Sequence, residues 1–327
     1  MPEHIPFKMP GRSKNSAGDW RSVGFELEFT SLDLVTTIKV VEQVLSGREK
    51  SRTPASAIIE VENLGDFSVE LDWNFLKQKA ETTQGSDEKE WLEILSQAAT
   101  LLVPIEVVCP PIPLNSMEVM NPLVQGLRQA GAVGTEDSLI AAYGIHINAE
   151  APNLELDTIR AYVEAFALLQ WWLVDEHKVD LARRVSPYVD LYPEAYLREL
   201  FSTQYTSIEQ FIHAYLKHNA SRNRALDMLP LLAHLNQDLV NAAVTDAKIK
   251  SRPAFHYRLP NCQIDKDSWS LAQSWNTWWV VEELANQPAE LEHLKRRFTS
   301  MNRPIFGVSR SDWTSLIHTW AQSKNLI

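Results

Sequence analysis

The residues of this chain that could do chemistry together are mostly acidic and lie on short alternating segments. Glu26 and Glu28 alternate with Phe25, Leu27 and Phe29, which is the two-residue period of a half-buried strand. Collecting the polar faces of all the segments expected to be strands gives a set without Lys or Arg: Glu26, Glu28, Asp66, Ser68, Glu70, Asp72, Glu106, His146 and Asn148. Because like charges destabilise neighbouring strands, this face indicates a missing cation.

The donor types in this set indicate which cation. Carboxylate oxygens with a few imidazole or amide neighbours suit Mg²⁺ or Mn²⁺. The chain has two cysteines, Cys109 and Cys262, which do not make a zinc site or a disulfide framework. A purely structural interpretation stays open, in which Glu26 and Glu28 form the solvated side of an amphipathic strand.

The elements that must position these residues follow from periodicity and chain breakers. Period-two alternation and short apolar runs predict strands at 23–29, 58–61, 66–73, 103–109, 142–149 and 254–259. Apolar stripes at helical spacing predict helices at 34–45, 88–102, 125–132, 157–184, 194–201, 208–217, 226–244, 269–284, 290–298 and 313–323. Asp157 is the expected N-cap of the long fourth helix.

This order of elements predicts an α+β fold with a mostly antiparallel sheet. Residues 1–20 contain several breakers and no period, so we expect an extended or poorly ordered arm. The strand at 254–259 returns after a helical stretch, so we expect one domain over 21–327. Its sheet core comprises 21–152 and 252–265, with a helical insertion at 153–251 and C-terminal helices at 266–327.

Composition narrows the classes of partner. Lys and Arg total 31 and Asp and Glu 42, a net charge of −11, which repels a nucleic-acid backbone. No apolar run approaches the roughly 20 residues that span a bilayer, and the N-terminus lacks the apolar core of a signal peptide. We therefore expect a cytoplasmic protein that acts on small molecules or peptides. The clustered tryptophans at 171–172 and 274–279 have the spacing of helix core packing rather than base stacking.

Four short motifs, taken in order, resemble the amidoligase family of the glutamine synthetase-like carboxylate-amine ligase superfamily. They are GFELE at 24–28, DFS at 66–68, IEVVCPP at 105–111 and YGIHIN at 143–148, and RPAFHYRLPN at 252–261 fits the late Arg-bearing strand of the family. The resemblance covers about 21–150 and 252–265. It implies a curved antiparallel sheet, like the catalytic domain of glutamine synthetase, whose acidic concave face holds Mg²⁺ ions, ATP and a carboxylate substrate.

The resemblance also implies roles for individual residues. The metal ligands it implies are Glu26, Glu28, Asp66, Glu106 and His146. The residues it implies at the nucleotide or its phosphates are Ser68, His146, Asn148, Arg252 and Arg258. Arg258 would contact phosphate or the developing acyl phosphate. Arg258 and the metal ligand Glu106 are therefore the expected catalytic residues. His146 and Arg258 could instead be structural, and Arg252 could be an ordinary loop residue.

Three positions depart from the family pattern. Asn148 stands where a second His is usual, and an amide oxygen binds metal more weakly than imidazole. His256 stands where related ligases often have Glu, and Asp66-Phe67-Ser68 replaces the more usual Asp-Gly-Ser. Asn261 could end the last strand or donate to a substrate carboxylate.

The expected function is an ATP- and Mg²⁺-dependent ligase that joins a carboxylate to an amine through an acyl phosphate. Phosphoryl transfer needs charge neutralisation by metal ions and an arginine rather than a protein nucleophile, and no phosphate-binding glycine-rich loop is present. A metal-dependent hydrolase and a catalytically silent binding protein of the same fold are the alternatives. Whether a partner protein supplies ammonia stays open.

Overall fold

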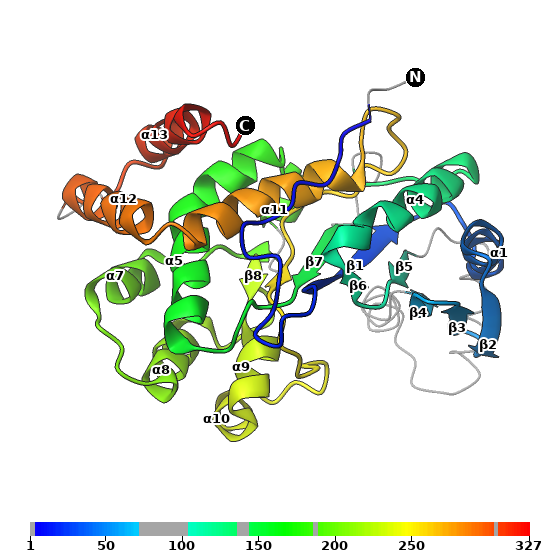
Figure 1. Cartoon of the computed structure of the whole chain (residues 1–327), viewed down its shortest axis with the longest axis horizontal. Coiled ribbons are helices and arrows are strands. Elements are labelled where there is room, and N and C mark those ends of the chain that lie inside the picture. Colours follow the sequence, from blue (N-terminus) through cyan, green and yellow to red (C-terminus); the bar gives the residue numbers. More distant parts are fainter. Residues whose placement is uncertain (1–3, 72–103, 136–143, 186–188, 304–306) are drawn as a thin grey trace, which may run out of the picture. The chain divides into compact units, whose positions relative to one another are not determined.

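The structure is a computed structural model that describes residues 4–71, 104–135, 144–185, 189–303 and 307–327. Asp72 and the helix expected at 88–102 lie outside the described residues. The chain divides into two compact units. Figure 1 labels the helices and strands that belong to them. The first unit comprises Met1–Pro6, Val23–His146 and Pro260–Gln273, and the second comprises Phe7–Ser22, Ile147–Leu259 and Ser274–Ile327.

The first unit is built on an antiparallel sheet with the strand order β2-β3-β4-β5-β1. Its apolar side chains alternate with polar ones, as the sequence predicts, and Leu27, Phe67 and Val69 are fully buried. The strands are β1 (Ser22–Phe29), β2 (Arg48–Arg52), β3 (Ser56–Val61), β4 (Gly65–Leu71) and β5 (Ile105–Val108), and β6 (Ile112–Pro113) pairs with β1. The mostly antiparallel sheet is thus confirmed, and β2 is an additional strand that was not predicted.

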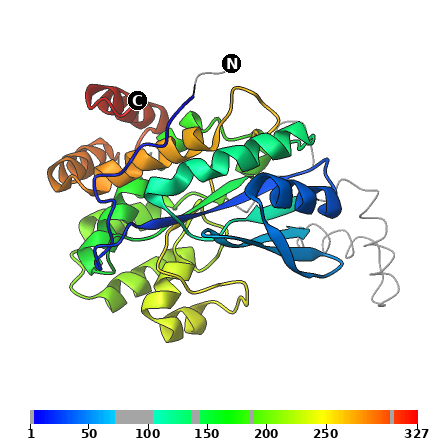
Figure 2. The ribbon, with the colours of Figure 1, turned by 45° about the vertical axis from the view of Figure 1, so that its right-hand side comes forward.

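Helices α1 (Leu34–Leu45) and α4 (Met120–Gln129) and a short 3-10 helix, η1 (Leu114–Val119), lie among the described residues of this unit. Helix α1 begins after Asp33, which accepts a hydrogen bond from the Thr36 amide, and contacts β3 and β4 (Figure 2). Helix α4 packs against α1, and a Cβ added at Gly126 would lie 2.6 Å from Val44. The helix predicted at 125–132 therefore begins and ends too late. Pro122 is accommodated because amides of the first turn have no partner within the helix.

In the described residues of the second unit, three antiparallel strands pair in the order β7-β9-β8. They are β7 (Ile145–Ala149), which enters this unit at Ile147, β9 (His256–Tyr257) and β8 (Leu226–Asp227). The returning strand predicted at 254–259 is shorter than expected. The helix predicted at 226–244 is wrong at its start, because Leu226 and Asp227 pair with β9. The rest is divided into α9 (Leu229–Leu235) and α10 (Gln237–Ala243), where Asn236 caps α10.

The long central helix is shorter than predicted. Helix α5 (Leu156–Glu176) ends before Lys178, whose φ of 48° is left-handed, and α6 (Leu181–Val185) follows separately. The N-cap of α5 is Glu155, so the N-cap predicted at Asp157 is wrong. The carboxylate of Asp157 lies in the first turn of the helix. The remaining helices are α7 (Glu194–Ser202), α8 (Ile208–Asn219), α11 (Leu271–Ala285), α12 (Pro288–Met301) and α13 (Arg310–Ser323).

Of the clustered tryptophans of the second unit, Trp171, Trp172, Trp275 and Trp278 pack in its core, as their spacing predicts, whereas Trp279 is only partly buried. Trp172, Trp275 and Trp278 are at most 1% exposed. Trp278 lies against Tyr257 of β9 with ring centroids 4.9 Å apart. Among the described residues, no helix combines the length and the apolar composition needed to cross a membrane.

A buried ion pair joins the segment Phe7–Ser22 to helix α11, along which this segment runs (Figure 1). Arg21 and Glu282 are fully buried and form two hydrogen bonds of 2.8 Å. Tyr162 donates to Glu282 at 2.5 Å and Trp278 donates at 3.1 Å. Burial alone lowers the pKa of Arg21, but the attraction of Glu282 more than reverses this, so the pKa of Arg21 is raised.

We expect Glu282→Gln to lower the free energy of unfolding by about 3–5 kcal/mol, because it leaves the charge of Arg21 buried and uncompensated. Urea unfolding measures this change. Glu283→Gln is the matched control on the same helix, since glutamine can still accept the hydrogen bond from Gly11. Equal stability of the two variants would contradict the prediction.

Candidate functional site

A row of glutamates crosses three neighbouring strands of the first unit. Glu28 of β1 lies opposite Glu106 of β5, and Glu106 lies opposite Glu70 of β4. Directly paired residues of antiparallel strands project to the same face, so three carboxyl groups meet there. Glu26 and Ser68 are both opposite Val108, which places them on the same face one step along the strands. We call Glu28, Glu106 and Glu70 the glutamate row.

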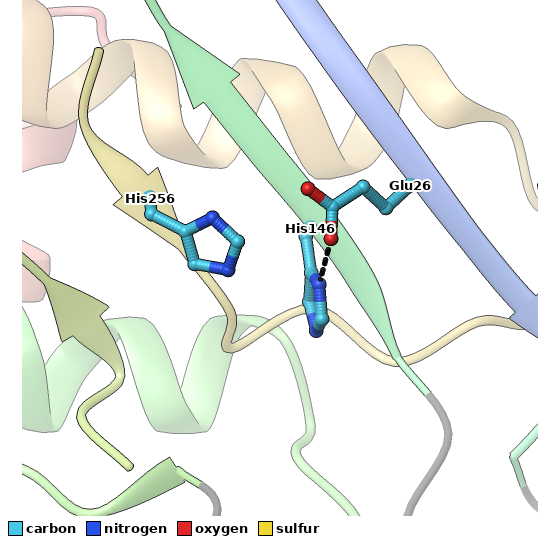
Figure 3. Close-up of side chains that lie close together, drawn as sticks. All are labelled: Glu26, His146 and His256. Atoms are coloured by element: carbon cyan, nitrogen blue, oxygen red, sulfur yellow. Dashed lines mark hydrogen bonds and ion pairs between the residues drawn. The ribbon is translucent and has the colours of Figure 1, made fainter. Parts of the chain in front are cut away.

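His146, at the start of β7, lies beside two of these glutamates. Its Nδ1 is 2.5 Å from Oε2 of Glu26 (Figure 3), and its Nε2 is 3.6 Å from Oε1 of Glu28. The other oxygen of Glu28, Oε2, accepts a hydrogen bond of 2.8 Å from the Gly144 amide. The side chain of His146 is 7% exposed. These contacts fix the orientation of both carboxylates of β1.

Glu106 carries the electrostatic consequence of this arrangement. Burial of its carboxyl group raises its pKa well above the usual range, and the negative charges of Glu26, Glu28 and Glu70 raise it further. A hydrogen bond with Glu26 adds to the shift, because a protonated Glu106 can donate to that carboxylate. Glu106 therefore retains a proton at a pH at which an exposed glutamate has lost it.

These side chains fit a divalent cation. Glu28, Glu106 and His146 each offer one ligand atom, and the three atoms lie within 4.8 Å of one another. Carboxylate oxygens dominate this donor set, which is the chemistry that Mg²⁺ and Mn²⁺ prefer. A bound cation would also offset the repulsion within the glutamate row, and it would take the place of the proton on Glu106.

Ser68 and Glu70 support this group from β4. The Ser68 hydroxyl donates to Oε1 of Glu70 at 2.5 Å, which orients the outermost member of the row. The alternation of β4 places Glu70 on the polar face, but the sequence offered no particular role for it. Its position in the row depends on the pairing of β4 with β5.

Asp66 lies apart from the glutamate row. It is exposed, it precedes the residues of β4 that pair with β5, and it forms an ion pair of 2.8 Å with Lys50 of β2. Of the residues expected to bind metal, the structure therefore brings together Glu26, Glu28, Glu106 and His146. The main chain of Asn261, also in the first unit, forms a bridge with Gly144.

In the second unit, the two positions that depart from the family pattern lie together with an arginine. Nη2 of Arg252 donates to Oδ1 of Asn148 at 2.6 Å and is 2.5 Å from Nδ1 of His256. The Nδ1 atom of His256 is also 2.7 Å from Oδ1 of Asn148. Asn148 and His256 are buried. With a guanidinium in contact with both side chains, this cluster is suited to an anion rather than to a cation.

Arg258 is held by its surroundings while part of its guanidinium stays unused. Its amide donates to the carbonyl of Ala225 at 2.8 Å, and its carbonyl accepts from Arg183 at 2.7 Å. Nη1 donates to the carbonyl of Arg222 at 2.6 Å, whereas the buried Nε has no hydrogen-bond partner among the described residues. A fixed guanidinium with open donors can bind a carboxylate or a phosphate.

The sequence missed Asp227, a polar residue close to these arginines. It is 1% exposed and lies opposite His256 in the pairing of β8 with β9. Burial raises its pKa to about 6, against the opposing effects of Arg258, Arg222 and Arg252. The segment around Asp227 has the apolar spacing of a helix, so the sequence does not single this residue out. Only the pairing of β8 with β9 shows its position beside His256.

Comparison with known proteins identifies the family of this chain. Residues 19–280 match the family described as "Putative amidoligase enzyme", which confirms the resemblance found from the short motifs. No curated protein and no solved structure matches the chain. The matched range contains all the candidate residues described above.

We expect Glu106→Gln to stabilise the metal-free protein at pH 8 and to have little effect near pH 4. A pKa that is raised in the folded state gives stability that is complete below the unfolded value of about 4.3 and is lost as the pH rises through the folded pKa. The gain is about 1.4 kcal/mol for each unit by which the pKa is raised, once the pH exceeds the folded value.

Urea unfolding of the wild type and of Glu106→Gln at the two pH values tests this. Glutamine can still donate to Glu26, so the fold is retained. Glu62→Gln, in an exposed turn, serves as the control. The same difference in stability at both pH values would show that Glu106 is not the group that titrates.

Proposed function

Because this chain belongs to the amidoligase family, which indicates a ligase-type enzyme that forms amide bonds, we propose that it joins a carboxylate to an amine with ATP and Mg²⁺. The carboxylate oxygen would bond to the γ-phosphorus of ATP as ADP leaves, giving an acyl phosphate. The amine nitrogen would then bond to the carbonyl carbon, lose a proton and release phosphate.

The observation that carries this proposal is the glutamate row with Glu26 and His146 beside it. Glu26, Glu28, Glu106 and His146 would hold the metal, and the raised pKa of Glu106 marks the place where positive charge is most needed. Mg²⁺, when bound, would neutralise the phosphates of ATP. Gly144 and His146 keep the carboxylates of Glu28 and Glu26 oriented for this task.

We propose anion-binding roles for Arg258, Arg252 and Asn148 of the second unit. Arg258 would bind phosphate or a substrate carboxylate through its open donors. Arg252, with Asn148, would bind a second anionic group. In the first unit, Ser68 would contribute to nucleotide binding through its contact with Glu70. No protein nucleophile is needed for this chemistry.

The setting that we propose follows from composition. Cys109 and Cys262 are buried free thiols, which agrees with a reducing compartment such as the cytoplasm. The net charge of −11 supports small-molecule or peptide substrates rather than nucleic acid.

We expect Mg²⁺ and ATP together to raise the melting temperature more than either alone, because a ligand that binds the native state stabilises it. Differential scanning fluorimetry with each ligand at millimolar concentration measures this. A shift with metal alone, unaffected by ATP, would favour the hydrolase. No shift under any condition would favour a catalytically silent protein.

We expect Glu28→Gln to abolish ATP turnover, by at least about a hundredfold, while the protein stays folded. Glutamine keeps an oxygen for the Gly144 amide but loses the charge that the metal requires. Phosphate release in the presence of pooled amines and carboxylates is the assay, and circular dichroism verifies the fold. Glu60→Gln, an exposed glutamate of β3, is the matched control. Normal ATP consumption by Glu28→Gln would overturn the metal assignment.

A further inference from the structure

A buried polar row crosses the three strands of the second unit. Ile147 pairs with Tyr257, which places Asn148 beside His256, and Asp227 lies directly opposite His256 on the other side. Asn148, His256 and Asp227 are 9%, 4% and 1% exposed. Buried polar side chains are costly unless their groups are satisfied, so this row calls for an explanation in terms of binding or stability.

Asp227 is the acidic member of this row. Its Oδ1 accepts a hydrogen bond of 2.9 Å from the Leu229 amide. Arg258, Arg222 and Arg252 act on it electrostatically, in that order of strength. Across the described part of the chain, however, Asp227 forms no ion pair with any of them. A buried carboxylate that serves only as a structural counter-charge normally contacts its cation.

Arg258 is the corresponding cation. It follows β9 directly, and its amide donates a hydrogen bond to the carbonyl of Ala225, the residue before β8. Its carbonyl accepts a hydrogen bond from Arg183, and its Nη1 donates to the carbonyl of Arg222. Its guanidinium is committed to one carbonyl, that of Arg222, as far as the described residues show. Two opposite charges are therefore fixed near each other in the same unit without pairing.

We propose that Asp227 and Arg258 together recognise the amine substrate, with the ammonium group on Asp227 and a neighbouring anionic group of the same molecule on Arg258. The chemical class is a zwitterionic amine of the amino-acid type. This inference rests on the proposed function insofar as the bound molecule is the amine of a ligase. A simple anion site would not place a carboxylate beside its arginines, because that carboxylate repels the ligand.

The choice of probes separates the two charges. Glycine and L-alanine carry an ammonium and a carboxylate, their N-acetyl derivatives carry only the carboxylate, and ethylamine carries only the ammonium. We expect the amino acids to bind the metal-free full chain at least about tenfold more tightly than either single-charge probe, since a hydrogen-bonded charge at a desolvated site contributes about one order of magnitude. Isothermal titration calorimetry measures the affinities.

The variant Asp227→Asn tests the assignment. Asparagine can still accept the hydrogen bond from the Leu229 amide, so the loop at the end of β8 is retained. We expect glycine and L-alanine to lose about tenfold in affinity, while N-acetylglycine binds as well as before or more tightly. A merely structural role would weaken all carboxylate probes alike. Asp246→Asn, an aspartate 3.7 Å from Arg222, is the matched control and should change neither affinity.

Three results would overturn the proposal. The wild type binds N-acetylglycine as tightly as glycine, the wild type binds neither probe, or Asp227→Asn still prefers the amino acid. Repeating the titrations in Glu28→Gln distinguishes this failure from failure of the proposed function. Amino-acid preference that persists in this variant shows that the site does not depend on the metal ligands, and wild-type protein that has this preference but is indifferent to ATP and Mg²⁺ would have an amino-acid site without ligase activity.

Discussion

The repulsion among glutamates on three neighbouring strands is the constraint on which the first unit depends. Glu28, Glu106 and Glu70 lie in one cross-strand row, with Glu26 one step away. The sheet tolerates them because His146 and the Gly144 amide contact the carboxylates of β1 and because Glu106 retains a proton. The same features prepare the row for a metal, since a cation replaces the proton and removes the repulsion. In the metal-free protein, the carboxyl groups that would bind a cation therefore lower the stability of the fold.

The second unit treats buried charge in two different ways. Arg21 and Glu282 are completely enclosed and bonded to each other in two places, with Tyr162 and Trp278 satisfying the remaining positions of the carboxylate. Such a pair holds the segment Phe7–Ser22 against helix α11 and leaves no group for a ligand. Asp227 and Arg258 are also fixed, but not by each other. Arg21 and Glu282 bind each other, which is why we assign them a structural role. Asp227 and Arg258 do not bind each other, which is why we assign them a role in recognition.

Much of the candidate site could be predicted from local pattern. The alternation in β1 and β4 gives the face on which Glu26, Glu28, Ser68 and Glu70 lie, because the side-chain period of a strand is a local property. The end of α5 could not be predicted from residue types. The helix ends near Lys178, because this residue takes a left-handed φ that a lysine does not signal in the sequence. Asp66 also alternates correctly, yet its contact with Lys50 depends on β2, a polar strand with no apolar signal of its own.

The sequence by itself determined where acidic residues alternate with apolar ones, the helical character of the second half, and the family, because all three are carried by residue types at short spacing. Only the tertiary structure decided which carboxylates share a row and that Leu226–Asp227 is a strand. It also decided that Asn148 and His256 contact Arg252 and each other. Hydrogen bonding between segments far apart in the chain sets strand register, and pairing with β9 overrides the helical spacing around Asp227. Local periodicity contains no information about that partner.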